Sequence, residues 1–250
     1  MIIKTAAELA AMQEIGKICA ITLKKMGEAL KPGITTKELD DYGAEILASY
    51  GAASAPITCY NFPGANCISV NDTVAHGIPD NTKIKAGDIV NIDVSAVKNG
   101  FFGDNGASFA VPPIKNNMQK LLAVGREALE LAIATAVAGS PLNGIGLSVE
   151  KCAKRHGYGT IRNLCGHGVG HTLHDEPDSI YNYFEKRDKR ILQPGLVLAI
   201  EPFISIGDQY VDEIGDGWTL KTPHCHQVVQ FEHTVMVRAD QPPLILTVPE

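Results

Sequence analysis

The feature that most constrains the fold is the segment at residues 91–104, which reads NIDVSAVKNGFFGD. Its Asn-Gly pair at 99–100 lies between two apolar runs, and this arrangement is the strongest short-range signal for a tight hairpin turn. Counting back from that turn puts Asp93 opposite Gly106, with Asp104 as the diagonal neighbour of Asp93. Side chains alternate between the faces of a strand, so a turn without a bulge predicts both carboxylates on one face.

These two acids lie in strongly apolar surroundings. The flanking residues are Ile89, Val90, Ile92, Val94, Phe101 and Phe102. Two like charges among such neighbours are costly unless one is protonated or a cation lies between them. The alternative interpretation is a solvated hairpin that carries two surface acids.

Length and charge limit the classes of protein to consider. A chain of 250 residues, 45% hydrophobic and 20% charged, is typical of a globular protein with one large or two small domains. The net charge of −6 and the absence of a Lys/Arg-rich block argue against a nucleic-acid substrate and against an anionic-membrane anchor.

The N-terminal segment and the cysteines predict a cytoplasmic location. The first twenty residues contain acids and lack the apolar core of a signal peptide, and the apolar run at 131–139 is too short to span a bilayer. The six cysteines form no CxxC pair, which is typical of free thiols in a reducing compartment. His224-Cys225-His226 is not expected to bind a metal, because neighbouring side chains in a strand point to opposite faces.

Helical and strand-like segments alternate in blocks. Capping boxes at Thr5 and Thr35 begin helices that end near residues 30 and 51. The further predicted segments are strands at 66–71, 88–97 and 101–111 and helices at 116–138 and 145–156. The order helices, strands, helices, strands indicates the α+β class.

The two halves of the chain contain a faint duplication. KAGDIVNID at 85–93 and QPGLVLAIE at 193–201 each place a carboxylate six residues after a turn glycine, which makes Asp93 and Glu201 equivalent. A histidine before a proline, His76 or His174, lies upstream of each. We therefore expect a single domain over residues 1–250, with pseudo-symmetric halves at about 1–112 and 113–250 around one central cleft.

Four carboxylates occupy strand-like segments, and we expect them to bind cations. They are Asp93, Asp104, Glu201 and Glu232. Four negative charges balance two divalent metal ions, and a carboxylate-rich set without thiolate favours manganese, iron or cobalt over a structural zinc site. The histidine candidates are His167, His171 and His174, whose glycine-rich surroundings argue against a helical HExxH site.

Five ordered motifs together resemble one family. They are VAHGIP, NIDVSAVKNGFFGD, GHGVGHTLHDEP, LAIEPF and FEHT. The chain is similar over nearly its whole length to the type I methionine aminopeptidases. Their pita-bread fold, a curved antiparallel sheet flanked by helices, is shared with aminopeptidase P, prolidase and creatinase.

The resemblance implies a set of metal ligands. Asp93 and Asp104 would bind one ion, and Asp104, His167, Glu201 and Glu232 would bind the other, with Asp104 and Glu232 as bridges. The cofactors implied are two divalent ions of cobalt, manganese, iron or zinc. Two neighbouring ions lower the pKa of a shared water and so supply a hydroxide nucleophile.

The resemblance also implies the reaction and its other residues. The enzyme would remove the N-terminal methionine from nascent proteins when the second residue is small. His174 would stabilise the tetrahedral intermediate and contact the substrate, Glu201 would relay the proton and His76 would contact the substrate. Tyr60, Phe62 and Trp218 would line an apolar pocket for the methionine side chain.

The chain departs from the family's pattern at two places. Asn105 stands where the family often has threonine, and Val228-Val229 where it often has small residues, which bears on the shape of the pocket and on inhibitor binding.

The alternatives are an X-Pro peptidase, whose relatives carry a large extra N-terminal domain, and a metal-free pita-bread binding protein. We expect a monomer, since no coiled-coil segment is present, and a transient ribosome contact stays open.

Overall fold

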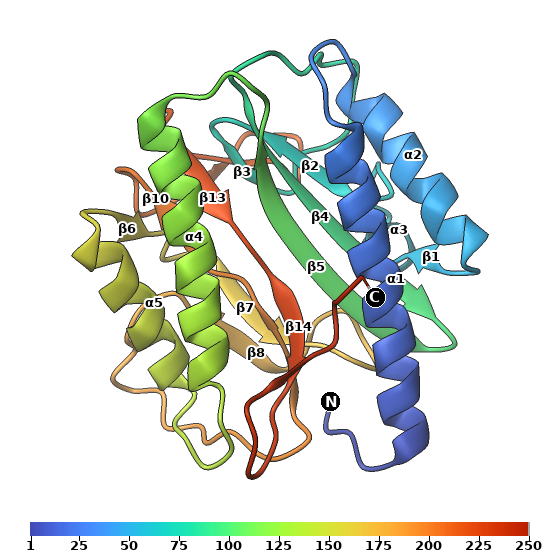
Figure 1. Ribbon diagram of the computed structural model, residues 1–250, viewed down its shortest axis with the longest axis vertical. Coiled ribbons are helices and arrows are strands. Elements are labelled where there is room, and N and C mark those ends of the chain that lie inside the picture. The colour runs from blue at the N-terminus through green and yellow to red at the C-terminus, as the bar shows by residue number, and fades with distance from the viewer. Residues whose placement is uncertain (250) are drawn as a thin grey trace.

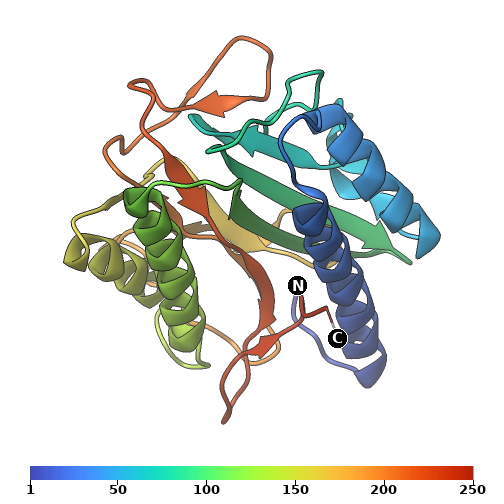
Figure 2. The same cartoon turned by 45° about the horizontal axis from the view of Figure 1, so that its top comes forward.

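The computed structural model describes residues 1–249, in which two groups of helices flank a layer of antiparallel strands (Figures 1 and 2). The helices are α1 (Ala6–Ala29), α2 (Thr36–Ser49), α3 (Ala55–Tyr60), α4 (Asn116–Thr135) and α5 (Asn143–Arg155). The strands are β1 (Ala53–Ser54), β2 (Cys67–Val70), β3 (Thr73–Ala75), β4 (Ile89–Lys98), β5 (Phe101–Ala110), β6 (Gly159–Thr160), β7 (Cys165–Gly168), β8 (Asp175–Tyr181), β9 (Val197–Ile200), β10 (Phe203–Ser205), β11 (Asp212–Glu213), β12 (Leu220–Lys221), β13 (Val228–Gln230), β14 (His233–Met236) and β15 (Leu244–Ile245). The expected α+β class is confirmed.

The hairpin of β4 and β5 has the predicted register. Asp93 pairs with Gly106, and Ser95 pairs with Asp104, with no bulge along the ladder. The turn residues Asn99 and Gly100 have φ angles of 52° and 78°. Positive φ at both positions is the type I′ geometry, whose twist matches that of the two strands. The prediction that both carboxylates project from one face is therefore confirmed.

The helices begin where their caps predict. Thr5 and Thr35 each form a capping box with the glutamate three residues later. The short helix α3 was not predicted from the sequence. The hydroxyl of Ser54 caps it by accepting a hydrogen bond from the Ile57 backbone N–H, at 3.2 Å.

The strands form several small sheets that meet at the centre of the molecule. β4 pairs with β5 along one edge and, at different positions, with β1 and β2 along the other, and a five-stranded sheet has the order β15-β14-β9-β7-β8. An isolated bridge between Ala107 and Phe231 joins the two halves. Helix α1 packs on β4 and β5, and α4 packs on β9, β10 and β13. Each half therefore has a helical layer on one side of its strands (Figure 1).

The sequence analysis placed two glutamates within strand-like segments, but in the structure both lie outside the strands. Glu201 follows the end of β9 and precedes β10, and Glu232 lies between β13 and β14. Both positions are breaks at which the chain passes from one sheet to another. A break frees the side chain from the strict alternation of a strand, so the faces of these glutamates could not be predicted from periodicity.

The segment around His224 also differs from its prediction. Residues 223–227 form a turn and an irregular connection before β13, and Cys225 has a left-handed φ of 57°. Strand alternation therefore does not apply here. His224 and His226 both contact Asp208 instead of pointing to opposite faces.

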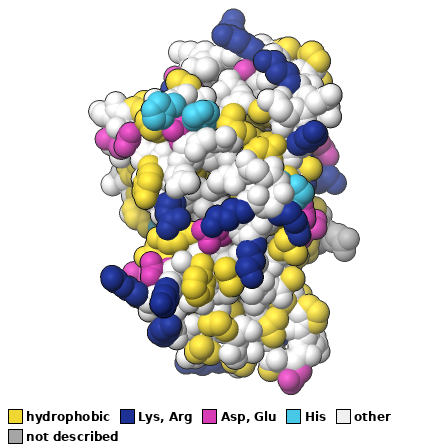
Figure 3. Space-filling model, turned by 90° about the vertical axis from the view of Figure 1, so that its left-hand side faces the viewer, with side chains coloured by type: hydrophobic (Ala, Val, Ile, Leu, Met, Phe, Trp, Pro, Cys, Tyr) yellow, Lys and Arg dark blue, Asp and Glu magenta, His cyan; other side chains and the backbone are white. Residues whose placement is uncertain are grey.

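The surface has mixed charge. On the face drawn in Figure 3, lysine and arginine side chains are interspersed with acidic ones, and histidine side chains are seen at the upper left and, separately, near the right edge. Among residues 1–249, no helix combines the length and the apolar character needed to cross a membrane.

Candidate metal centre

The hairpin presents Asp104 in a rigid setting. The Ser95 hydroxyl donates a hydrogen bond of 2.7 Å to Oδ1 of Asp104. The Asp104 backbone N–H donates to Thr234 Oγ1 at 3.0 Å, and the same hydroxyl donates to the Asp104 carbonyl at 2.7 Å. Thr234 comes from β14 in the other half of the chain, so it fixes this carboxylate relative to the second half.

The second half presents Glu232 with the help of Gln230. The Gln230 side-chain amide donates to Oε2 of Glu232 at 2.8 Å and accepts a hydrogen bond of 2.8 Å from the Asn91 amide. A Cβ at Gly106 would lie 2.6 Å from Gln230 Oε1 and 2.9 Å from Glu232 Oε2. Gly106 is therefore needed, because only a residue without a side chain lets these two groups approach the hairpin.

Acidic oxygens from both halves converge. One ligand atom from each of Asp93, Asp104 and Glu232 lies within 4.8 Å of the other two. Nε2 of His167 lies 3.6 Å from Oδ2 of Asp104 and 3.6 Å from Oε1 of Glu201. Nδ1–H of His167 donates to the Gly168 carbonyl at 2.9 Å, which leaves Nε2 with the lone pair that a metal ligand requires.

Burial perturbs every carboxyl group of this cluster. It raises the pKa of Asp104 to about 6, although hydrogen bonds from Ser95 and other neighbours act in the opposite direction. Burial, followed by the charges of neighbouring carboxylates, raises the pKa of Asp93, Glu201 and Glu232 well above the ordinary range. Concentrated negative charge in a buried site is the physical cause, and a cation would reverse it.

The unpaired oxygens fit a divalent metal. Oδ1 of Asp93 and Oε1 of Glu232 are buried and have no hydrogen-bond partner among residues 1–249. No lysine or arginine is among the described residues that line the adjoining cavity. Buried acidic oxygens without a partner are rare in proteins, and a set of carboxylates with one imidazole is a donor set that divalent metals accept.

A cavity of about 280 Å³ opens beside the carboxylates. The predicted site residues that line it are Tyr60, Phe62, His76, Asp93, Asp104, His167, His174, Glu201 and Trp218. Phe62 packs edge to face against Trp218 with ring centroids 5.2 Å apart. Glu232 lies behind this wall, next to Asp93 and Asp104.

Two histidines face the cavity as neutral groups. Nδ1 of His174 lies 2.5 Å from the Tyr60 hydroxyl, and its ring centroid is 4.3 Å from that of His167. Desolvation, followed by the nearby His167, lowers the pKa of His174 to about 4. Desolvation and His174 also lower the pKa of His76, which follows β3 with a left-handed φ of 53°.

The sequence analysis did not identify several residues that support the site. They are Pro56, Cys67, Ser95, Leu173, Gln230 and Thr234. Ser95 could have been found, because the predicted register already paired it with Asp104. Thr234 and Gln230 act across the interface between the halves and left no local signal. His171 and His233 are not among the residues that line the cavity.

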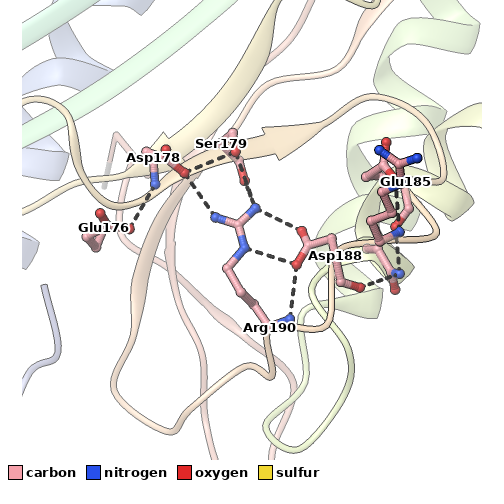
Figure 4. Close-up of polar contacts among 8 residues, drawn as sticks. Glu176, Asp178, Ser179, Glu185, Asp188 and Arg190 are labelled. Carbon is pink, nitrogen blue, oxygen red and sulfur yellow. Dashed lines mark hydrogen bonds and ion pairs between the residues drawn. The ribbon is translucent and has the colours of Figure 1, made fainter.

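Arg190 is a further residue that the sequence analysis did not identify. Its guanidinium donates to the Ser179 carbonyl at 2.6 Å and to carboxylate oxygens of Asp178 at 3.1 Å and Asp188 at 2.8 Å (Figure 4). Asp178 and Ser179 lie on β8, the strand that begins directly after His174. Arg190 therefore anchors the element that follows this cavity histidine.

Comparisons with known proteins agree with this geometry. The model of metallopeptidase family M24 matches residues 10–239. A methionine aminopeptidase of Staphylococcus epidermidis is 47% identical over 246 residues, which are 97% of each chain. The crystal structure of methionine aminopeptidase from Rickettsia prowazekii has a TM-score of 0.94 at 34% identity and covers 99% of this chain and 100% of that one. The expected pita-bread fold is confirmed.

A more distant structure shares the fold alone. Prolidase from Pyrococcus furiosus has a TM-score of 0.80 at 23% identity, and the match covers all of this chain but only 66% of that one.

Proposed function

The chain belongs to metallopeptidase family M24, and from that premise we propose that it removes the N-terminal methionine of peptides and proteins by metal-dependent hydrolysis. The observation that carries this function is the meeting of acidic and imidazole ligand groups with an apolar cavity of about 280 Å³. The ligands supply the metal chemistry, and the cavity suits one unbranched side chain. We treat residues 1–250 as one catalytic unit built from two halves.

The proposed metal ligands are five side chains. They are Asp93, Asp104, His167, Glu201 and Glu232, which together would hold two divalent ions. Cobalt, manganese, iron and zinc all accept such oxygen and nitrogen donors. When bound, the ions would polarise the peptide carbonyl and lower the pKa of water toward neutrality.

The chain's own residues would then orient the substrate and transfer protons. Nδ1 of the neutral His174 lies 2.5 Å from the Tyr60 hydroxyl, and in the tautomer in which this hydroxyl donates to Nδ1, His174 would present Nε2–H as a donor to the reacting carbonyl oxygen. Glu201 lies at the cavity wall and relays the proton to the leaving amine. His76, which also lines the cavity, binds the substrate amide.

The apolar part of the cavity would accept the methionine side chain of the substrate. Phe62 and Trp218 contact each other edge to face, and Tyr60 and Leu173 complete the wall. Aromatic rings and a thioether sulfur attract each other, by about 0.3–1.5 kcal/mol for each contact. The substrates we propose are the N-termini of nascent proteins in the cytoplasm whose second residue is small.

The experiment that tests this function is the release of methionine from a Met-Ala-Ser peptide by the intact protein with added Mn²⁺ or Co²⁺. We expect release from this peptide, and none from an X-Pro peptide of the same length. An Asp104→Ala variant should release no methionine. Absence of methionine release by the intact, metal-loaded protein would contradict the proposal.

A pair of histidine variants separates catalysis from general damage to the fold. His174→Ala should lower kcat/KM by about 100-fold, the scale of losing one hydrogen-bond donor to the transition state. His171→Ala is the matched control, because His171 lies outside the cavity and packs against Phe101 with ring centroids 5.2 Å apart. Equal losses in the two variants would argue against a catalytic role for His174.

A further inference from the structure

A second group of ligand-type side chains lies outside the cavity. Nδ1 of His224 lies 2.6 Å from Oδ1 of Asp208, and Nδ1 of His226 lies 2.9 Å from Oδ2 of the same carboxylate. The His224 backbone N–H also donates to Asp208 at 3.2 Å. The carboxylate is buried, whereas both imidazoles remain accessible to solvent. One ligand atom from each of the three residues lies within 4.8 Å of the other two.

The backbone is shaped to bring these side chains together. Cys225 has a left-handed φ of 57°, which reverses the chain between the two histidines. The Thr222 hydroxyl donates to the His226 carbonyl at 2.8 Å and holds this turn. A Cβ at Gly207 would lie 2.6 Å from the His226 ring, so the imidazole packs directly on the backbone next to Asp208.

The chemistry of the group fits a transition metal. Two imidazoles and one carboxylate are a common zinc donor set, with water able to complete the coordination from the exposed side. Within residues 1–249, no lysine or arginine forms an ion pair with Asp208. The histidines are therefore the partners of this buried charge, and both imidazoles already meet at it.

We propose that Asp208, His224 and His226 form a second metal site, separate from the central carboxylates, which binds Zn²⁺ and ties together the two ends of the loop that carries Trp218. The loop ends are already adjacent, because the Ile206 backbone N–H donates to the Gln227 carbonyl at 3.2 Å. Between them the chain forms β11 and β12, and β12 pairs with β3 directly before His76. A metal at the base of the loop would restrain this wall of the cavity.

Zinc stoichiometry tests the site. The intact protein, a His224→Ala/His226→Ala double variant and the His171→Ala control are loaded with Zn²⁺, freed of excess metal and analysed for bound zinc. We expect the double variant to hold about one equivalent fewer than the other two proteins, because structural zinc requires its imidazole ligands. Equal zinc contents in all three proteins would overturn the proposal.

A second variant and a second measurement keep the proposal testable if the double variant does not fold. Gly207→Ala leaves every ligand in place but pushes the His226 ring away from Asp208, so it should also lose the extra equivalent. Amide hydrogen exchange in residues 209–223 of the intact protein should slow by at least about twofold when Zn²⁺ is added to the Mn²⁺-loaded form. Unchanged exchange with zinc bound would overturn the restraint on the loop.

Discussion

The two halves of the molecule bring carboxylates to the same point in different ways. The first half presents Asp93 and Asp104 from a continuous hairpin whose ten-residue ladder has no bulge. The second half presents Glu201 and Glu232 at breaks between short strands. A continuous ladder fixes side-chain direction by local alternation, whereas a break leaves direction to packing against the other half. The two acid pairs are near each other and yet depend on different parts of the structure.

The largest effect is expected from variants that remove one carboxylate charge from each half in turn. Asp104→Asn and Glu232→Gln keep the shape of the side chain and remove a shared ligand. We expect both to lower kcat/KM by more than the roughly 10- to 100-fold that losing an outer partner of a ligand costs. Peptide assays with Mn²⁺ titration measure this loss. A small loss of kcat/KM in only one of these two variants would mean that the halves do not share their ions.

Removal of the metal should destabilise the fold, because buried carboxylates from both halves then lack a cation. Each bound ion, at a free concentration 100 times its dissociation constant, should stabilise the fold by about 2.7 kcal/mol, since it binds only the native state. Calorimetry with and without a chelator measures the difference. An unchanged melting temperature would contradict metal binding by these carboxylates.

The pH dependence of the metal-free protein distinguishes Asp104 from the other three carboxyl groups. A carboxyl with a raised pKa contributes stability that is present at low pH and lost as pH rises through its folded-state pKa. For Asp104 this loss begins near its ordinary pKa of 3.8 and is nearly complete by about pH 6, and for Asp93, Glu201 and Glu232 it extends to higher pH. The stabilisation by added metal should therefore grow from pH 5 to pH 8. A metal effect that shrinks over this range would argue against the raised pKa values.

A pair of neighbouring hydrogen bonds gives an intermediate effect. Gln230→Leu removes the link between Asn91 and Glu232 and leaves buried polar groups without that partner, which should cost about 1–3 kcal/mol of unfolding free energy. Ser95→Ala removes one hydrogen bond within the hairpin and should cost about 1 kcal/mol. Urea unfolding compares them. A larger cost for Ser95→Ala would reverse the view that the second half depends more on tertiary contacts.

The smallest expected effect on activity concerns the turn itself. Gly100→Ala places a Cβ at a φ of 78° in open surroundings and should cost about 1–2 kcal/mol of unfolding free energy without changing kcat/KM. Gly139→Ala is the matched control in the second half, with a φ of 82° and equally open surroundings. A loss of activity with Gly100→Ala alone would show that the turn also positions the carboxylates.

The sequence predicted much of the fold because its signals were local. The capping boxes at Thr5 and Thr35 located two helix starts, and the Asn-Gly pair at 99–100 set the register of the hairpin. The helix α3 was missed because six residues give too little periodicity to recognise. His224 and His226 were assigned to opposite faces because a left-handed residue between them could not be read from the pattern.

The sequence by itself determined which acids lie on one face of the hairpin, because alternation and a two-residue turn are properties of the local chain. It also contained the motifs that indicate the family. Only the tertiary structure decided how Glu232 reaches Asp93 and Asp104, since that contact requires the bare backbone of Gly106 and the bridging amide of Gln230. The physical reason is that residues more than a hundred positions apart meet through packing, and packing has no period that can be read along the chain.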